Sequence, residues 1–201
     1  YESTCSISEG NEDAVYFVVN RTINGQPARY IERLSSRLYS TDEDAFFVDS
    51  GLSYDGRNAN GARAVSITGG SGTWSYQQPY TLTITGSNYF VSSDVGAQIQ
   101  IPYSEMEDGE MVSKELRLDV QSVTSGTAVV VMASRDIPEA LHNTATTNWQ
   151  LARRKFSGLS HLEGQTVNIL SDGSVEPQKV VSGGEVTLES PGAIVHIGLP
   201  I

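Results

Sequence analysis

The sequence predicts an all-β protein made of small antiparallel β-barrel or sandwich domains, one of them inserted into another. Short runs of apolar, β-branched and aromatic residues recur along the chain, and Gly- or Asn-containing turns separate them about every ten residues. Almost no segment shows the periodicity of an amphipathic helix. These three observations together favour strands joined by tight turns over any helical architecture.

The clearest predicted element is a hairpin near the N-terminus. Residues 14–23 form an apolar, β-branched strand, Asn24-Gly25 has the composition of a hairpin turn, and residues 28–34 form the return strand. Alternation along the return strand predicts two faces. One face carries Tyr30, Glu32 and Leu34, and the other carries Arg29, Ile31 and Arg33.

Further strands are predicted along the whole chain, at residues 3–8, 45–49, 64–68, 80–85, 97–103, 113–123, 128–133, 149–156, 165–170, 175–181, 185–188 and 194–199. Residues 50–62 are rich in Gly and Asn and are predicted as loop. Residues 137–142 form the one predicted short helix, because Pro138 suits a first helical position. Turns are predicted at Asp108-Gly109, Asp172-Gly173, Gly183-Gly184 and Pro191-Gly192, among others.

Changes in composition predict the domain boundaries. Residues 1–62 and 142–201 are expected to form one discontinuous β domain, and residues 63–141 an inserted small β-barrel domain. A linear three-part order would produce the same boundaries. Because the chain begins with Tyr1 and ends in an apolar run, we expect it to be a piece of a longer chain.

The charge balance argues against a protein that grips nucleic acid. The net charge is -11, with 24 acidic and 13 basic residues, so the chain is expected to repel DNA rather than neutralise its phosphates. Such repulsion suits a conduit through which DNA slides. No stretch approaches the roughly 20 apolar residues of a membrane helix. The single cysteine, Cys5, cannot form an internal disulfide and is interpreted as a small core or strand residue.

No catalytic residue, metal site or cofactor is predicted. Gly70-Ser71-Gly72 lacks the spacing of a nucleophile elbow and is interpreted as a loop. The three histidines, His142, His161 and His196, are far apart in sequence and lack metal-ligand spacing. Residues 55–61 resemble a calcium loop only loosely, since the closing glutamate is missing.

Two charged clusters are interpreted as surface features. Glu105, Glu107, Asp108 and Glu110 are expected at a solvated hairpin tip. Residues 153–155 (Arg-Arg-Lys) lie in a predicted strand, where alternate side chains point to opposite faces, so we expect a solvated edge or an inter-subunit salt bridge rather than a phosphate site.

Three aromatic residues, Trp74, Tyr76 and Tyr80, lie close together in sequence and motivate an alternative function. Exposed aromatic rings of this kind can stack on sugars, which would make the chain a carbohydrate-binding module. The favoured interpretation is that these rings pack a barrel mouth or a domain interface.

Two regions resemble a known family. The first comprises residues 13–25 (DAVYFVVNRTING), 29–34 (RYIERL) and 45–56 (AFFVDSGLSYDG). The second comprises residues 156–167 (FSGLSHLEGQTV), then Asp172-Gly173, Val180-Val181, Gly184 and residues 195–200 (VHIGLP). Together they cover somewhat under half of the chain and resemble the central part of the tail nozzle proteins of short-tailed bacteriophages, also called tail tubular protein B or stabilisation proteins.

The middle of the chain carries a second resemblance. Residues 90–96 (FVSSDVG), before a predicted strand, are similar to inserts that resemble a β-barrel half-domain of ubiquitin-activating enzymes. This resemblance concerns the fold alone. The region has no cysteine, so it implies no thioester chemistry.

The nozzle resemblance implies a structural, non-enzymatic role in the virion tail. Nozzle proteins form rings, typically of six copies, contain β-propeller-like and β-barrel parts, bind an adaptor ring above and fibres or a needle below, and let DNA pass without specific binding. A fragment that lacks most ring contacts would be a monomer in solution. The connector of residues 158–164 is interpreted as a folding feature. Gly158 and Gly164 would allow a tight reversal around His161, while Leu159 and Leu162 would anchor it in the core.

Three hypotheses of function therefore remain open from the sequence. The first is a virion structural protein and the second a carbohydrate-binding module. The third is a hydrolase that attacks the host envelope, for which no pair among the many carboxylates stands out.

Overall fold

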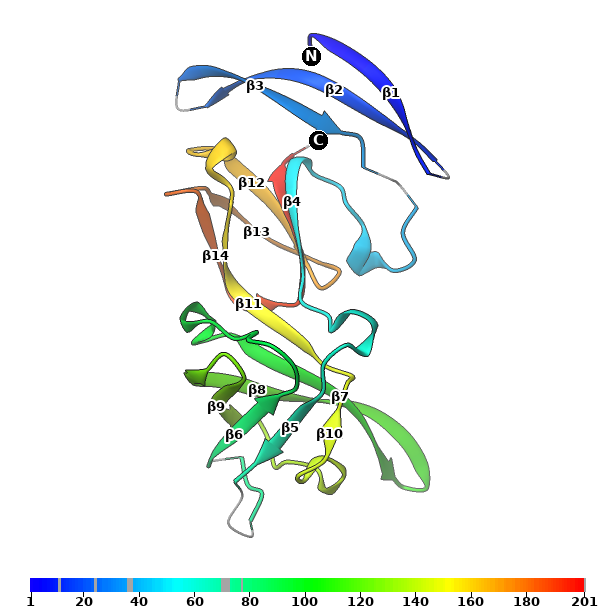
Figure 1. The fold of residues 1–201 in the computed structure, drawn as a ribbon, viewed down its shortest axis with the longest axis vertical. Coiled ribbons are helices and arrows are strands. Elements are labelled where there is room, and N and C mark those ends of the chain that lie inside the picture. The colour runs from blue at the N-terminus through cyan, green and yellow to red at the C-terminus, as the bar shows by residue number, and fades with distance from the viewer. Residues whose placement is uncertain (11, 24, 36–37, 70–72, 77, 201) are drawn as a thin grey trace. The chain divides into compact units, whose positions relative to one another are not determined.

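The computed structural model describes residues 1–10, 12–23, 25–35, 38–69, 73–76 and 78–200. The chain divides into two compact units (Figure 1). Unit 1 comprises Tyr1–Tyr54, Lys155–Leu188 and Ile194–Ile201, and unit 2 comprises Asp55–Arg154 and Glu189–Ala193. The predicted boundaries at 62/63 and 141/142 therefore both fall inside unit 2.

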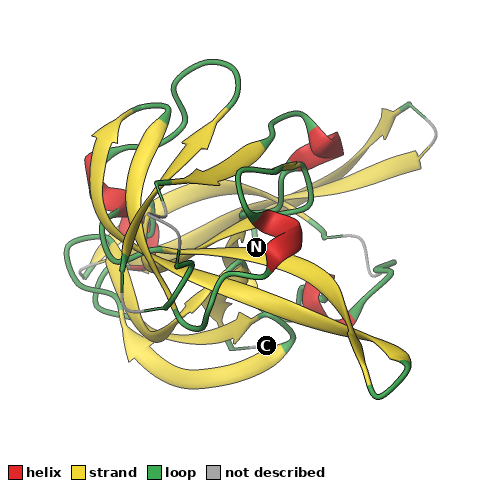
Figure 2. Ribbon diagram, turned by 90° about the horizontal axis from the view of Figure 1, so that it is seen from below, coloured by secondary structure: helices red, strands yellow, loops and turns green. Residues whose placement is uncertain are grey.

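Strands and their turns dominate the ribbon, and the helical segments are single short turns (Figure 2), so the predicted all-β fold class is confirmed. None of the helical turns among the described residues has the length and apolar character needed to cross a membrane.

Unit 1 contains a three-stranded antiparallel sheet of β1 (Ser3–Glu9), β2 (Glu12–Ile23) and β3 (Gln26–Arg33). The predicted hairpin is thus present, although Asn24 of its turn lies outside the described residues. The two faces of β3 differ as the alternation predicted: Tyr30 and Glu32 are half-buried, whereas Ile31 is exposed. Leu34, which follows β3, is exposed. Cys5 is also exposed, on β1.

Unit 1 also contains a four-stranded sheet in the order β13-β12-β15-β4, formed by Ser174–Val180, Thr166–Ser171, Ile194–Leu199 and Asp49–Asp55. Its core includes Val167, Ile169, Val195 and Ile197, together with the connector residues Leu159 and Leu162. Two 3-10 turns, η1 (Asp42–Asp44) and η5 (Ser160–Leu162), accompany this sheet.

Strand β4 corrects the prediction for residues 45–62. Residues 45–48 have no regular structure, and the strand runs through residues predicted as loop. Gly and Ser lower the strand propensity of this segment, but Leu52 and Tyr54 alternate with polar residues and pack against the core. Tertiary burial therefore outweighs local propensity here.

Unit 2 is built on seven consecutive members of one sheet, in the order β10-β5-β6-β9-β8-β7-β11. Strand β14 (Glu185–Gly192) follows β11 in that sheet, and both strands have residues in both units. The members are β5 (Val65–Thr68), β6 (Pro79–Ile84), β7 (Gln98–Glu107), β8 (Glu110–Ser125), β9 (Ala128–Ala133), β10 (Ala145–Thr146) and β11 (Gln150–Ser157). Strands β10 and β11 are separated in sequence only by residues 147–149, although five strands lie between them in the sheet. The sheet therefore curves round on itself like a barrel wall.

The inner face of this curved sheet forms the core of unit 2. Every second residue of β6 and of β9 is buried, as expected for strands with one face inward. Leu82, Ile99, Leu116, Leu118 and Val129 are fully buried there. Two further 3-10 turns, η2 (Ala59–Gly61) and η3 (Ser92–Asp94), lie in the loops of this unit.

Two local predictions in this part of the chain were wrong. The predicted helix at residues 137–142 is a single 3-10 turn, η4 (Glu139–Leu141), because Pro138 keeps an extended ψ of 143° and Ile137 and Leu141 are buried on either side. The predicted turn at Pro191-Gly192 is part of β14, and the chain bends at Ala193 instead.

Candidate functional site

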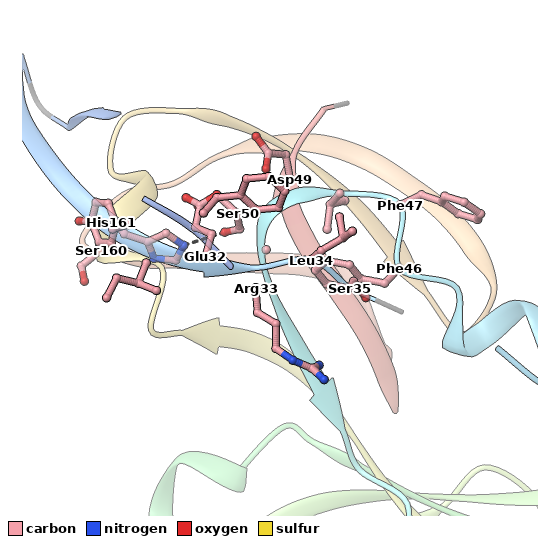
Figure 3. A pocket seen from close by; sticks show the side chains of 15 residues that line it. Glu32, Arg33, Leu34, Ser35, Phe46, Phe47, Asp49, Ser50, Ser160 and His161 are labelled. Carbon is pink, nitrogen blue, oxygen red and sulfur yellow. Dashed lines mark hydrogen bonds between the residues drawn. The ribbon is translucent and has the colours of Figure 1, made fainter. Parts of the chain in front are cut away.

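A pocket of about 830 Å3 lies in unit 1. Its walls come from β3, from the segment before and at the start of β4, and from the η5 turn. The labelled lining residues are Glu32, Arg33, Leu34, Ser35, Phe46, Phe47, Asp49, Ser50, Ser160 and His161 (Figure 3). Glu32, Ser50 and His161 lie close together, whereas Phe47 lies at the opposite end and the Arg33 side chain points away.

At the polar end of this pocket, Glu32 and Asp49 form an ion-pair cluster with Arg21. The guanidinium donates to both Glu32 carboxylate oxygens at 2.6 and 2.8 Å and to Asp49 Oδ2 at 2.9 Å. Arg21 and Glu32 have side chains only 16% and 20% exposed. Hydrogen bonding from Arg21 lowers the pKa of Glu32 below its ordinary value, and the same contact raises the pKa of Arg21. Both groups are therefore charged near neutral pH.

Residues 49–51 adopt a backbone that explains their composition. Ser50 has φ 53°, in the left-handed region, and its hydroxyl donates to Glu32 Oε1 at 3.2 Å. A Cβ on Gly51 would lie 2.5 Å from Val48 Cγ2, 2.7 Å from Phe46 Cζ and 2.9 Å from the Ile197 carbonyl oxygen. Glycine is thus required at position 51 by the close approach of neighbouring groups.

The predicted connector supplies His161 to this cluster. The His161 Nε2–H donates to the carbonyl oxygen of Ser50 at 2.8 Å, and its ring lies 6.0 Å from that of Tyr30. Gly158 and Gly164 have φ values of 91° and 75°. Leu159 and Leu162 are fully buried, so the turn is anchored on its apolar side.

The geometry of Ser50, His161 and Glu32 differs from that of a catalytic triad. A nucleophilic serine needs its hydroxyl within hydrogen-bond reach of a base such as histidine. Here the Ser50 hydroxyl donates to Glu32, and His161 contacts the Ser50 backbone carbonyl instead. These contacts fix the position of β4 and β3 and do not activate a nucleophile.

The other two histidines are engaged in structural contacts. His196 is 7% exposed; its Nε2–H donates to the Glu43 carbonyl oxygen at 3.0 Å, which leaves Nδ1 to accept from the Ser53 hydroxyl at 2.7 Å. His142 donates from Nε2 to the Ile137 carbonyl oxygen at 2.8 Å. In the part of the chain that the structure describes, no three His, Cys, Asp or Glu side chains are grouped closely enough to hold a metal ion.

The loop resembling a calcium site uses its carboxylate differently. Asp55 accepts from the Arg57 guanidinium at 2.7 to 3.2 Å, so a cation already neutralises it. Asn58 donates to the carbonyl oxygens of Arg63 and Thr147 at 2.7 and 2.6 Å. The elbow-like residues Gly70-Ser71-Gly72 lie outside the described residues.

The charged clusters are mostly paired. At the tip of the β7–β8 hairpin, Lys114 Nζ donates to Glu105 at 3.0 Å and also to Glu107. Within residues 153–155, Arg153 pairs with Asp94 at 2.8 Å and Lys155 with Glu185 at 2.6 Å. Asp94 is fully buried and also accepts from the Val91 N–H at 2.9 Å. No residue spacing in the sequence predicted that the Asp94 carboxylate would be buried.

The aromatic group of unit 2 is divided between packing and solvent. Tyr80 is 1% exposed and donates its hydroxyl to the Ser75 carbonyl oxygen at 2.8 Å. The Trp74 ring stacks on Tyr80 at 5.4 Å and on His142 at 4.2 Å between centroids. Burial raises the pKa of Tyr80. Tyr76, by contrast, is 48% exposed.

Fold and sites together define the class as an all-β protein of two compact units. Compared with known proteins, the chain matches no family model and no curated protein.

Proposed function

We propose that this chain is a structural component of the tail nozzle of a short-tailed bacteriophage, without an active site of its own. One observation carries the proposal: the two regions that resemble the nozzle family come together in unit 1. Arg21, Glu32 and Ser50 belong to the first region and His161 to the second, and they form one hydrogen-bonded cluster. Sequence separated by more than a hundred residues thus builds a single compact element.

The chemistry of that cluster supports a structural role. The charged side chains of the cluster pair with one another. Arg21 and Glu32 form a bidentate ion pair that is partly shielded from water. Across the described residues, every buried side-chain nitrogen or oxygen has a hydrogen-bond partner. A subunit of a ring needs a rigid interior in which the buried polar groups are hydrogen-bonded. An active site needs polar groups that remain available to a substrate near a cavity.

In the assembled tail, the protein would form a ring of about six copies, the number that the family resemblance implies. Other tail proteins would be its partners: an adaptor ring on one side and fibres or a needle on the other. DNA would pass through without specific binding, and the net charge of -11 is compatible with such a conduit.

The proposal is tested by light scattering and negative-stain imaging of the full-length protein, alone and mixed with its tail adaptor. Rings with a central channel are expected, together with a complex on the adaptor. The Arg21→Ala variant should form fewer rings, because it breaks the cluster, whereas Arg29→Ala, which loses an exposed ion pair, should behave as wild type. A persistent monomer that does not bind the adaptor would contradict the proposal.

A further inference from the structure

A second pocket, of about 630 Å3, lies within unit 2. It forms where three segments meet: Tyr76, residues 134–139, and the β7–β8 hairpin at Tyr103, Glu105 and Lys114. Its volume lies in the range that binds small molecules, and its lining combines aromatic rings with several charged groups. The ion-pair cluster of unit 1 does not account for it.

The Tyr76 side chain gives this pocket an aromatic surface that faces solvent. It is 48% exposed, and its backbone N–H donates to Asp136 Oδ1 at 3.0 Å, which fixes the chain at this position. Its neighbours Trp74 and Tyr80 are engaged in ring stacking within the unit. Of the three aromatic residues that suggested sugar binding, Tyr76 is the most exposed, since Trp74 is half-buried and Tyr80 is buried.

An accessible aromatic ring among polar groups suits a saccharide. The face of the ring is electron-rich and attracts the polarised C–H bonds on one side of a pyranose. The hydroxyl groups at the edge of the sugar then need acceptors and donors nearby. Carboxylates of Asp136 and Glu139 supply acceptors, and the exposed guanidinium of Arg135 supplies donors.

The charge of the lining indicates which saccharides fit. Glu105, Asp136 and Glu139 are acidic, and Lys114 and Arg135 are basic, so the pocket carries one net negative charge. Lys114 is held by Glu105 and Glu107, whose hydrogen bonds raise its pKa. An acidic glycan would meet repulsion from the pocket and from the net charge of -11, whereas a neutral glycan would not.

We propose that the pocket of Tyr76, Arg135, Asp136 and Glu139 is a binding site for neutral hexose oligosaccharides, with Tyr76 as the stacking platform. This proposal goes beyond the structural role above and stands independently of it, because a ring protein without glycan affinity and a glycan-binding monomer are both conceivable results.

Binding is tested on the whole chain with a panel of neutral α- and β-linked hexose hexasaccharides and with a hexauronate as the acidic counterpart, by saturation-transfer NMR and calorimetry. A neutral member of the panel is expected to bind more tightly than the hexauronate. Tyr76→Ala should weaken that binding at least about tenfold, since exposed aromatic residues dominate such contacts. Tyr76→Phe retains the ring and should stay close to wild type.

Two further variants make the test specific. Arg135→Gln removes charge-assisted donors and should weaken binding between about two- and tenfold. Tyr39→Ala removes an exposed tyrosine of unit 1, 40% exposed, and should change nothing. The proposal is overturned if no neutral oligosaccharide of the panel binds, if the hexauronate binds better, or if Tyr76→Ala binds as well as wild type.

Discussion

The curved sheet of unit 2 and the three-stranded sheet of unit 1 are stabilised in different ways. In unit 2, alternate residues of β5, β6 and β9 are fully buried in one apolar core. In the three-stranded sheet, all seven residues of β1 are exposed, and Ala14 is the one residue of β2 classed as buried. Among the described residues, the core cluster of unit 1 includes none from β1, β2 or β3.

The three-stranded sheet is attached to the rest of unit 1 by contacts that include charged groups. Its contacts to β4 and η5 include the Arg21–Asp49 ion pair, the hydrogen bond from Ser50 to Glu32, and the ring contact of Tyr30 with His161. Hydrophobic burial depends little on pH, whereas ion pairs require both groups to be charged. We therefore expect the two sheets to respond differently to mutation, pH and salt.

The largest effect is expected from the apolar core of unit 2. Leu118 is fully buried on β8, so Leu118→Ala should lower the free energy of unfolding by about 2–5 kcal/mol through lost burial and the cavity left behind. Chemical denaturation monitored by Trp fluorescence measures this loss. Met111→Ala, at a position 64% exposed on the same strand, should cost less than about 0.5 kcal/mol. Equal losses for both variants would contradict the assignment of the core.

Gly51 lies on β4, where the apolar sheet of unit 1 meets the polar cluster. Gly51→Ala should destabilise unit 1 by about 1–3 kcal/mol, because the added methyl group would meet Val48 Cγ2 at 2.5 Å and the Ile197 carbonyl at 2.9 Å. Thr187→Ala, an exposed position on β14, should cost less than about 1 kcal/mol. Amide hydrogen exchange in β4 and β15 should accelerate and so locate the effect. Unchanged exchange there would show that the neighbouring groups move aside and accommodate the methyl group.

Breaking the ion-pair cluster should release the three-stranded sheet selectively. Glu32→Gln leaves Arg21 without its partly buried bidentate partner, which we expect to cost about 1–3 kcal/mol. Amide exchange in β2 and β3 should accelerate while exchange in the core strands of unit 2 stays constant. Glu115→Gln, which removes the ion-pair partner of the exposed Arg117 on β8, serves as the matched control. Equal acceleration in both units would contradict this local role.

The same cluster should make the three-stranded sheet sensitive to acid. The pKa of Glu32 lies below its ordinary value of 4.5 in the folded protein, chiefly because of its hydrogen bond from Arg21. Its contribution to stability is therefore complete above the unfolded pKa and is lost as the pH falls through the lower, folded pKa. Exchange in β2 and β3, corrected for intrinsic rates, should rise between about pH 5 and pH 3. Glu32→Gln should flatten this rise, and an unchanged profile in that variant would assign it to other carboxylates.

The elements that the sequence could predict are those with local signals. Alternating apolar residues at 80–85 and 128–133 specified strands because one face of each is buried in a large core. The turns with Gly25, Gly109 and Gly173 were found because positive φ favours glycine. Each of these signals depends on a few residues that are neighbours in the sequence.

The missed features depend on contacts between distant residues. Strand β4 was predicted as a loop, because the packing of Leu52 and Tyr54 and the close approach at Gly51 involve β15 and the connector. The cluster of Arg21, Glu32, Asp49 and His161 was missed for the same reason, since its members lie up to 140 positions apart in the chain. Likewise, the partner of the buried Asp94 is Arg153, 59 positions away in the chain.

The smallest effect is expected at an exposed ion pair of the three-stranded sheet, which joins β3 to the residue before β1. Arg29 donates to Glu2 at 2.8 Å, much like the Arg21–Glu32 contact, but its side chain is 71% exposed. Water and salt screen such a pair, so a double-mutant cycle of Arg29→Ala and Glu2→Gln should give a coupling of at most about 1 kcal/mol that vanishes at high salt. The corresponding cycle on Arg21 and Glu32 should keep a larger, less salt-dependent coupling. If the two cycles give the same coupling free energy, burial does not strengthen the Arg21–Glu32 ion pair. The attachment of this sheet must then come from the apolar residues that line the pocket next to β3.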